Sequence, residues 1–282
     1  MNLKDRRQFL QSMGLAAAVT ATGSCQAQTR TGQIASKKVV REFKMGLASY
    51  TLRKFNLKET LAMTKRVGLE YISLKSFHLP LNSTPEEISQ ATEIIKKAGI
   101  KLYGGGVIYM KNEKDVHQAF EYARMAGMKM IIGVPVPDVL GLVEKKVKEY
   151  DIMMAIHNHG PTDKVYPTPG SAYEKIKHLD RRIGLCNDIG HTQRAGVDPS
   201  ESVLKYADRL IEIHVKDVSK AAKEGKTVEI GRGVIDIPKF IRALIKINYT
   251  GVISFEYEKD PTDPLAGLAE SVGYVKGVLA AS

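Results

Sequence analysis

The sequence contains no tryptophan and only two cysteines among its 282 residues. So few cysteines exclude the disulfide framework that stabilises many small secreted domains. Cys25 lies in an N-terminal segment typical of an export signal, which leaves Cys186 as the one thiol of the remaining chain. Because Cys186 stands inside an apolar run, we expect it to be a buried core residue rather than a metal ligand or a nucleophile.

Acidic residues are fewer than basic ones, 31 against 42, which gives a net charge of +11. A nucleic-acid groove would need clustered basic residues with stacking aromatic residues between them. Here the lysines are scattered, as at Lys96-Lys97 and Lys145-Lys146, and no aromatic stripe accompanies them. We therefore expect a solvated basic surface and no nucleic-acid partner.

Long hydrophobic runs are also missing. The apolar stretch at residues 13–22 is much shorter than the ~20 residues that span a membrane. It follows the pair Arg6-Arg7, so we interpret residues 1–27 as a twin-arginine-type export signal. Residues 28–43 are polar and basic and are interpreted as a linker. The expected location is therefore the periplasm.

An imperfect lipobox ends at Cys25. Two outcomes are open for this segment. Either Cys25 carries a lipid that anchors the protein to the membrane, or cleavage after Ala27 removes the cysteine with the signal.

A repeated junction runs through the first half of the chain. Three glycines stand between an expected helix and an expected strand: Gly68, Gly99 and Gly127. They recur every 28 to 31 residues, the length of one strand–helix unit, and each fits the left-handed C-cap of a helix. The segment Thr84-Pro85-Glu86-Glu87 is typical of a helix start, with an N-cap, a first-turn proline and a capping-box glutamate.

Eight short apolar segments alternate with the helices. We predict strands at residues 45–49, 71–75, 101–104, 130–133, 152–157, 183–188, 210–215 and 252–256, and a last helix at residues 264–279. This order predicts an α/β fold, a single closed (β/α)8 TIM barrel over residues 44–282. The alternative is an open doubly wound sheet, which would need a glycine-rich loop after the first strand, where residues 48–53 contain no glycine. The three glycines at 104–106 are expected to let the backbone bend at the barrel mouth.

Polar residues gather at the ends of the last four predicted strands. The clusters are His157 with His159, Asp188 with His191, His214 with Lys216, and Glu256 with Glu258. Active sites of such barrels lie at the carboxyl ends of the strands. Imidazole and carboxylate groups in this combination suit one divalent metal ion, such as Mn, Co, Zn, Ni or Fe.

The chain resembles the xylose-isomerase-like barrels, a family of sugar phosphate isomerases, epimerases and inosose dehydratases, over about residues 44–280. The segments that carry the resemblance are Asp188-Ile189-Gly190-His191, His214-Val215-Lys216-Asp217, Gly231–Asp236 and Gly251–Glu258. It implies one divalent metal, with His157, Asp188, His214 and Glu256 as ligands, and substrate contact for His191. Two alternatives stay open: His159 ligates while His157 orients the site, and His191 only caps the following segment.

Two positions depart from the family pattern. Many isomerases and epimerases carry glutamate at the end of the fifth strand, where this chain has His157. A metal-bound imidazole is not free to act as a base, which disfavours epimerisation by two symmetric carboxylates. The second strand commonly ends in glutamate but here in Lys75, whose ammonium could hold a substrate oxygen or act as a base if desolvation lowers its pKa.

Three further residues are candidates for proton transfer: Lys216, Glu258 and His159. For Lys216 the alternative is an ion pair with Asp217 or Glu258. For Glu258 the alternative is a structural pairing with a lysine.

The resemblance and the ligand set predict a metal-dependent enzyme that enolises a keto-sugar, with a small carbohydrate as its substrate. Since export favours glycosides over cytoplasmic sugar phosphates, the leading hypothesis is a lyase that cleaves 3-keto-glycosides by elimination across C1 and C2. The alternatives are a sugar isomerase or epimerase with the same metal, an apurinic-type endonuclease, and a non-catalytic exported carbohydrate-binding protein. Export and the few ligands at the first four strand ends disfavour the endonuclease, and the complete ligand set disfavours the binding protein.

Overall fold

Eight parallel strands close into a barrel in the computed structural model, which describes residues 43–282. Because β1 pairs with both β2 and β10, the sheet has no edge. The predicted TIM barrel is confirmed, and the open sheet is excluded. The barrel strands are β1 Lys44–Ala48, β2 Tyr71–Leu74, β3 Lys101–Met110, β4 Met130–Pro135, β5 Met153–His157, β6 Ile183–Asp188, β7 Leu210–Val215 and β10 Val252–Phe255. The expected export signal and all but the last residue of the expected linker lie outside the described residues.

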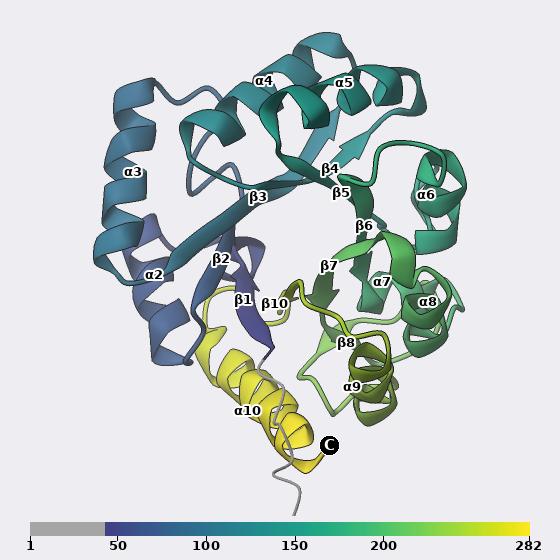
Figure 1. Cartoon of the computed structure of the whole chain (residues 1–282). Coiled ribbons are helices and arrows are strands. Elements are labelled where there is room, and N and C mark those ends of the chain that lie inside the picture. Colours follow the sequence, from purple (N-terminus) through teal and green to yellow (C-terminus); the bar gives the residue numbers. More distant parts are fainter. Residues whose placement is uncertain (1–42) are drawn as a thin grey trace, which may run out of the picture. The chain divides into compact units, whose positions relative to one another are not determined.

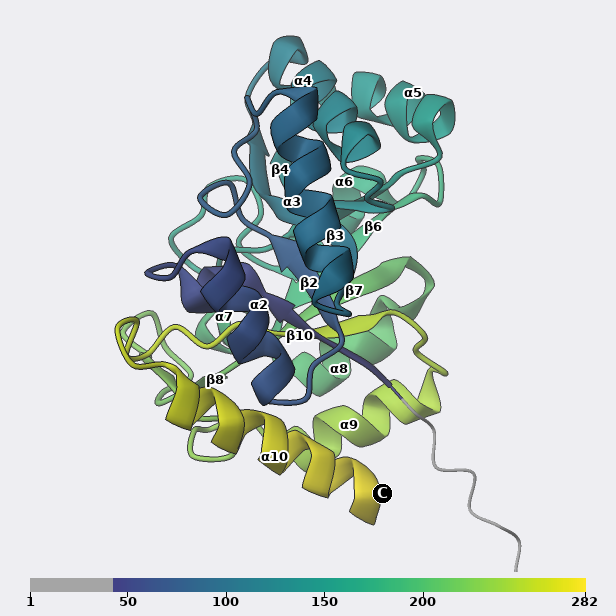
Figure 2. The same ribbon diagram turned by 90° about the vertical axis from the view of Figure 1, so that its left-hand side faces the viewer.

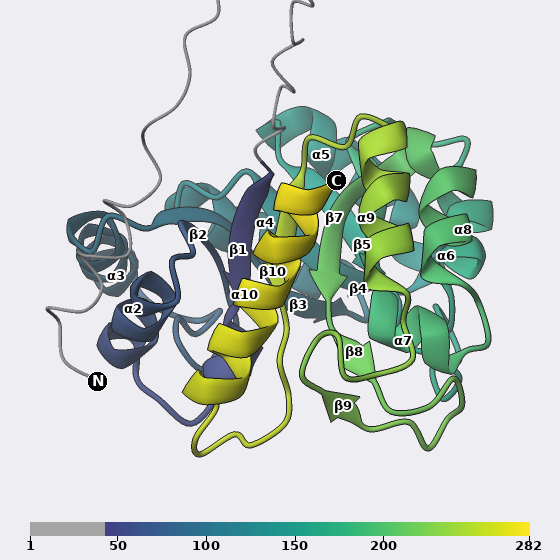
Figure 3. The same ribbon diagram turned by 90° about the horizontal axis from the view of Figure 1, so that it is seen from below.

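Helices surround the strands on the outside of the barrel (Figures 1 and 2). They are α2 Leu57–Arg66, α3 Pro85–Lys97, α4 Glu113–Met125, α5 Leu140–Tyr150, α6 Pro169–Ile176, α7 Ile189–Arg194, α8 Pro199–Lys205, α9 Ile237–Lys246 and α10 Leu265–Ala281, with short 3-10 helices at Ser49–Leu52, Pro137–Val139 and Ala207–Arg209. An antiparallel pair, β8 Asp217–Val218 and β9 Thr227–Val228, lies beyond the carboxyl end of β7 (Figure 3). Among the described residues, no helix is both long and apolar enough to cross a membrane.

The predicted helix signals act as expected. Thr84 accepts a hydrogen bond from the N–H of Glu87, whose carboxylate accepts one from the N–H of Thr84, so the capping box at the start of α3 is confirmed. Gly99 follows α3 with a φ of 72°, in the left-handed region that glycine adopts at little cost. These local signals fix where α3 ends and β3 begins.

The third strand is longer than predicted. The glycines at 104–106 lie inside β3, so their expected place at a bend of the barrel mouth is wrong. A Cβ on Gly104 would lie 2.9 Å from the carbonyl oxygen of Met130, and one on Gly106 would overlap the carbonyl oxygen of Ile132. Close approach of neighbouring groups therefore requires glycine here, a reason that the sequence alone does not reveal.

Apolar side chains fill the inside of the barrel, where Met130, Ile132, Ala155 and Cys186 form a buried cluster. Cys186 is free and buried, which confirms the expected core position. Burial raises the pKa of the Cys186 thiol to about 12, so the thiol stays protonated at neutral pH.

Asp217 anchors the loop that follows β9. Its Oδ1 accepts hydrogen bonds from the N–H groups of Val218, at 2.8 Å, and Ile235, at 3.2 Å. Its Oδ2 accepts from the N–H groups of Gly231 and Gly233, both at 3.0 Å. Four main-chain donors occupy this carboxylate, so Asp217 is not the partner of Lys216.

Candidate metal centre and substrate pocket

Four neighbouring strands bring the predicted metal ligands together. His157 ends β5, Asp188 ends β6, His214 lies near the end of β7, and Glu256 follows β10 directly. These strands are consecutive around the barrel (Figure 1). One ligand atom from each residue lies within 4.8 Å of every other, and all four residues are buried.

The ligand atoms face a common point. His157 Nε2 lies 3.1 Å from His214 Nδ1 and 3.5 Å from Asp188 Oδ2. His214 Nδ1 lies 3.2 Å from Glu256 Oε2. Asp188 Oδ2 is buried, and the ammonium of Lys216 lies 2.9 Å from it. Two imidazole nitrogens and two carboxylate oxygens that converge in this way fit a divalent metal ion, which prefers such mixed nitrogen and oxygen ligands.

A second possible ligand group contains His157, Cys186 and His214. The protonated thiol of Cys186 is a poor ligand, because metals bind the thiolate. Neither group contains His159, so the geometry favours His157 over His159 as the ligand from the fifth strand.

Lys216 follows β7 directly, is buried, and pairs with the ligand carboxylates. Its Nζ is 2.9 Å from Asp188 Oδ2 and 2.7 Å from Glu256 Oε2, and it also pairs with Glu258. Burial disfavours the ammonium charge, but the three carboxylates outweigh this effect and hold the pKa of Lys216 well above its ordinary value. Three carboxylates against one ammonium leave two negative charges, which one divalent cation would balance.

A cavity of about 210 Å³ opens above the ligands. Its lining residues are Tyr50, Lys75, Val107, Tyr109, His157, His159, His191, Glu256 and Glu258. Four predicted catalytic or substrate-binding residues are thus in the wall of one pocket. Lys216, the fifth, is buried and is not part of the lining.

The predicted pocket residues have well-defined partners. The ring of His159 lies 4.4 Å from that of His157, and its Nε2 is 3.1 Å from the hydroxyl of Tyr109. Burial lowers the pKa values of His159 and His191 to about 3, so both rings are uncharged at neutral pH. Lys75 Nζ donates to the carbonyl oxygen of Val107 at 2.6 Å, and burial lowers the pKa of Lys75.

Asp188, and not the side chain of His191, caps α7. His191 takes part in this cap only through its main chain. Its N–H donates to Asp188 Oδ1 at 2.8 Å, so Asp188 caps α7 at the position of His191. The side chain of His191 lines the pocket as well. Capping and substrate contact are therefore compatible here.

Three lining residues were missed by the sequence analysis: Tyr50, Val107 and Tyr109. Tyr50 lies in the short helix after β1, and Tyr109 lies in the part of β3 that was not predicted. The sequence feature that could have identified the two tyrosines is an aromatic residue close to the end of an apolar strand segment in the first half of the barrel.

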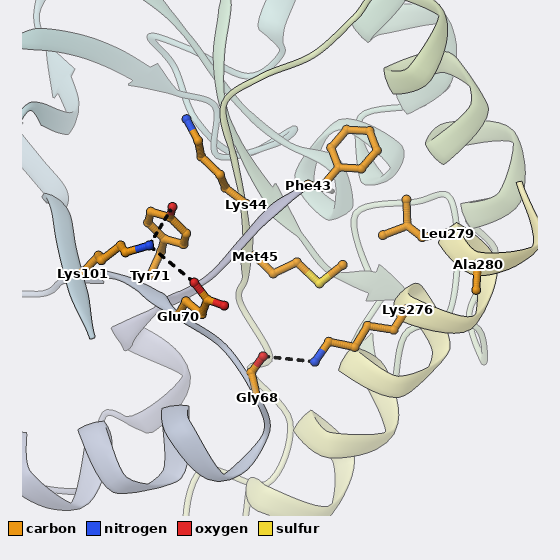
Figure 4. A pocket seen from close by; sticks show the side chains of 10 residues that line it. All are labelled: Phe43, Lys44, Met45, Gly68, Glu70, Tyr71, Lys101, Lys276, Leu279 and Ala280. Atoms are coloured by element: carbon orange, nitrogen blue, oxygen red, sulfur yellow. Dashed lines mark hydrogen bonds and ion pairs between the residues drawn. The ribbon is translucent and has the colours of Figure 1, made fainter. Parts of the chain in front are cut away.

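A wider cavity of about 540 Å³ lies at the opposite end of the barrel, beside the amino ends of β1 and β2 and the last turns of α10 (Figure 4). Three of its four charged side chains, all except Lys44, are already paired. Lys101 Nζ lies 3.5 Å from Glu70 and 3.4 Å from the hydroxyl of Tyr71, and Lys276 Nζ donates to the carbonyl oxygen of Gly68 at 3.0 Å. Because TIM barrels carry their active sites at the carboxyl ends of the strands, the smaller cavity is the functional candidate.

Comparison with known proteins identifies the family. The family model of the xylose isomerase-like TIM barrel matches residues 40–278, so this chain belongs to that family. The rhizopine catabolism protein MocC of Rhizobium meliloti is 29% identical over 133 residues, which cover 42% of this chain and 40% of that protein. The inosose dehydratase of Geobacillus kaustophilus is 30% identical over 115 residues, which cover 33% of this chain and 37% of that enzyme. The chain thus matches less than half the length of these curated relatives.

Solved structures show the same fold. A protein from Parabacteroides distasonis has a TM-score of 0.66 at 25% identity, and the match covers 83% of this chain and 98% of that one. The IolI protein, solved with a bound zinc atom, has a TM-score of 0.70 at 19% identity, covering 85% of this chain and 99% of IolI.

Proposed function

We propose that this protein is a divalent-metal-dependent enzyme that enolises a keto-sugar, and that it cleaves 3-keto-glycosides by elimination. The position of the pocket carboxylates favours elimination over epimerisation. Both of them, Glu256 and Glu258, come from the β10 side. The β5 side contributes His157 and His159 instead. Epimerisation by two bases would use a carboxylate on each side of the sugar, whereas elimination needs one base and one acid. Relatives named inosose dehydratases support this class, because dehydration is also an elimination.

A divalent cation bound by His157, Asp188, His214 and Glu256 would act as a Lewis acid toward the carbonyl and hydroxyl oxygens of the sugar. The ketone at C3 acidifies the hydrogen on C2. A pocket base takes that proton, the C–H electron pair forms the C1–C2 double bond, and the C1–O bond breaks. Its electron pair leaves on the oxygen of the aglycone, which gains a proton. The products are an alcohol and an unsaturated keto-sugar.

The pocket offers groups for both proton transfers. His159 reaches it from the segment after β5 and Glu258 from the segment after β10, so they face a bound ring from different sides. Either can accept the proton from C2, and the group that has taken this proton can then pass it to the leaving oxygen. Lys75 supplies an ammonium donor for a substrate hydroxyl or carbonyl oxygen.

The proposal includes export of the protein through its N-terminal signal. The twin-arginine pattern at Arg6-Arg7 supports transport to the periplasm, and Cys25 is the candidate for a lipid anchor. A periplasmic enzyme meets glycosides and their oxidised forms rather than sugar phosphates, which favours glycosides as substrates.

Aglycone release from 3-keto-glucosides tests the proposal directly. The purified, metal-loaded protein is expected to release the aglycone, and Glu256→Ala is expected to abolish this release. Glu270→Ala is the matched control, because Glu270 pairs with Arg232 on the surface, away from the pocket. Deuterium uptake from solvent next to the ketone without release would instead indicate an isomerase or epimerase. Sugar binding with neither signal would contradict the enzyme proposal.

A further inference from the structure

The mouth of the pocket has two chemically different halves. The ligand-bearing strands β5, β6, β7 and β10 form one half, and β1, β2 and β3 belong to the other (Figure 1). Three aromatic residues follow or end these latter strands: Tyr50, Phe77 and Tyr109. Phe77 is 45% exposed and Tyr109 is 50% exposed, and they are two of the five exposed large hydrophobic side chains among residues 43–282. A cluster of this kind at a pocket mouth points to a binding surface.

The tyrosine rings are held in place although they are open to solvent. The ring of Tyr109 stacks on His159, with centroids 5.6 Å apart and planes 18° apart. The guanidinium of Arg53 lies 4.8 Å from the ring centroid of Tyr50, and Arg53 Nη2 donates to the carbonyl oxygen of Glu258 at 2.8 Å. Rings fixed in this way lose little conformational freedom when a ligand packs on them.

Phe77 extends this surface. Its ring centroid lies 6.1 Å from that of Tyr50 and 4.7 Å from that of His78, which it meets edge to face. His78 is itself buried, with Nδ1 2.9 Å from Ser49 Oγ and Nε2 3.0 Å from Thr60 Oγ1. Phe77 therefore rests on a fixed support and presents an aromatic surface to solvent.

The size of the cavity indicates what these rings contact. About 210 Å³ is below the ~300 Å³ at which ordinary ligand pockets begin, so the cavity suits a single small ring. Any further ring of the substrate must lie outside the cavity, at the mouth. Arg53 and Lys75 flank the aromatic residues, and each donates to a main-chain carbonyl group, so neither directs all of its donors at the mouth.

We infer that Tyr50, Phe77 and Tyr109 form a subsite for the leaving group of the glycoside, and that this group is itself a ring. The substrate class is then aryl glycosides and disaccharides, rather than free monosaccharides or sugar phosphates. Aromatic side chains pack well against the apolar faces of such rings. This inference rests on the proposed function, because it assigns the second ring to the group that leaves from C1.

Phe77→Ala tests the subsite without touching the ligands. For 3-keto-glucosides we expect the ratio of kcat/KM between phenyl and methyl leaving groups to fall about three- to tenfold, the value of one aromatic contact. Phe77→Trp should keep the ratio. Tyr274→Ala, which removes an exposed aromatic side chain of α10, should leave it unchanged. An unchanged ratio in Phe77→Ala would overturn the subsite.

A binding measurement separates this inference from the proposed function. Calorimetry with phenyl and methyl β-glucoside, which lack the 3-ketone, reports the subsite without turnover. Tighter binding of the phenyl compound that is lost in Phe77→Ala supports the subsite even if no keto-glycoside is cleaved. Cleavage by the wild-type protein with equal binding of both compounds would leave the function intact and contradict the subsite.

Discussion

Replacing Asp188 with asparagine is expected to lower the affinity for a divalent metal by more than ~100-fold, beyond the usual loss for an outer-shell partner. The substitution removes one of the two carboxylates whose oxygens lie among the imidazole nitrogens of His157 and His214. The fold should survive, because Asp188 also caps α7 through Oδ1 and asparagine caps helices equally well. Metal content after dialysis and calorimetric titration would measure the loss, and aglycone release should disappear with it.

His214→Ala is also expected to lower the affinity for a divalent metal, because it removes one of the imidazole ligands. His214 Nδ1 lies 3.1 Å from His157 Nε2 and 3.2 Å from Glu256 Oε2, so the substitution removes a nitrogen from the centre of the ligand set. His117→Ala is the matched control, since His117 is an exposed histidine on α4. One retained equivalent of metal in both Asp188→Asn and His214→Ala would contradict the proposed ligand set.

Replacing Lys216 with methionine is expected to destabilise the metal-free protein by ~3–5 kcal/mol, the usual effect of removing one partner of a buried ion pair. In a domain of this size that corresponds to a fall in melting temperature of roughly 10 °C. The reason is that Asp188, Glu256 and Glu258 would then face one another without a counter-charge. A divalent metal should restore more stability to this variant than to the wild-type protein, because it would balance more negative charge.

Thermal unfolding with and without metal measures both effects. Lys239→Met serves as control, because Lys239 pairs with Asp198 at 2.6 Å on the surface, where an ion pair contributes only about 0–1 kcal/mol. If Lys216 served only in proton transfer, its substitution would change turnover and leave the melting temperature of the metal-free protein unchanged. That outcome would contradict the role of Lys216 as an internal counter-charge.

The sequence was most informative where local patterns decide the structure. Capping signals such as Thr84 and Gly99 mark helix ends through contacts within a few residues. The end of each strand in the second half carried a titratable residue, so a metal site could be predicted there from barrel topology, and the family resemblance implied which residues would ligate. His157, Asp188, His214 and Glu256 are brought together as that reasoning required.

Other features depend on contacts that a single sequence does not display. The burial of Lys216 among three carboxylates follows from the packing of separate strands, which keeps it out of the pocket wall. The aromatic half of the mouth was missed because Tyr50 and Tyr109 are not typical metal ligands and stand beside strands without polar clusters. The glycines of β3 were misread for a related reason, since their neighbours come from another strand.

Those glycines also affect how natural variation in this chain should be interpreted. Gly104 and Gly106 are limited by the space that the main chains of Met130 and Ile132 leave, and none of the glycines at 104–106 lines the pocket. Selection would therefore preserve them as strictly as it preserves a metal ligand. An alignment would mark both kinds of position with the same invariance, and only their surroundings distinguish a residue kept for its chemistry from one kept for its small size.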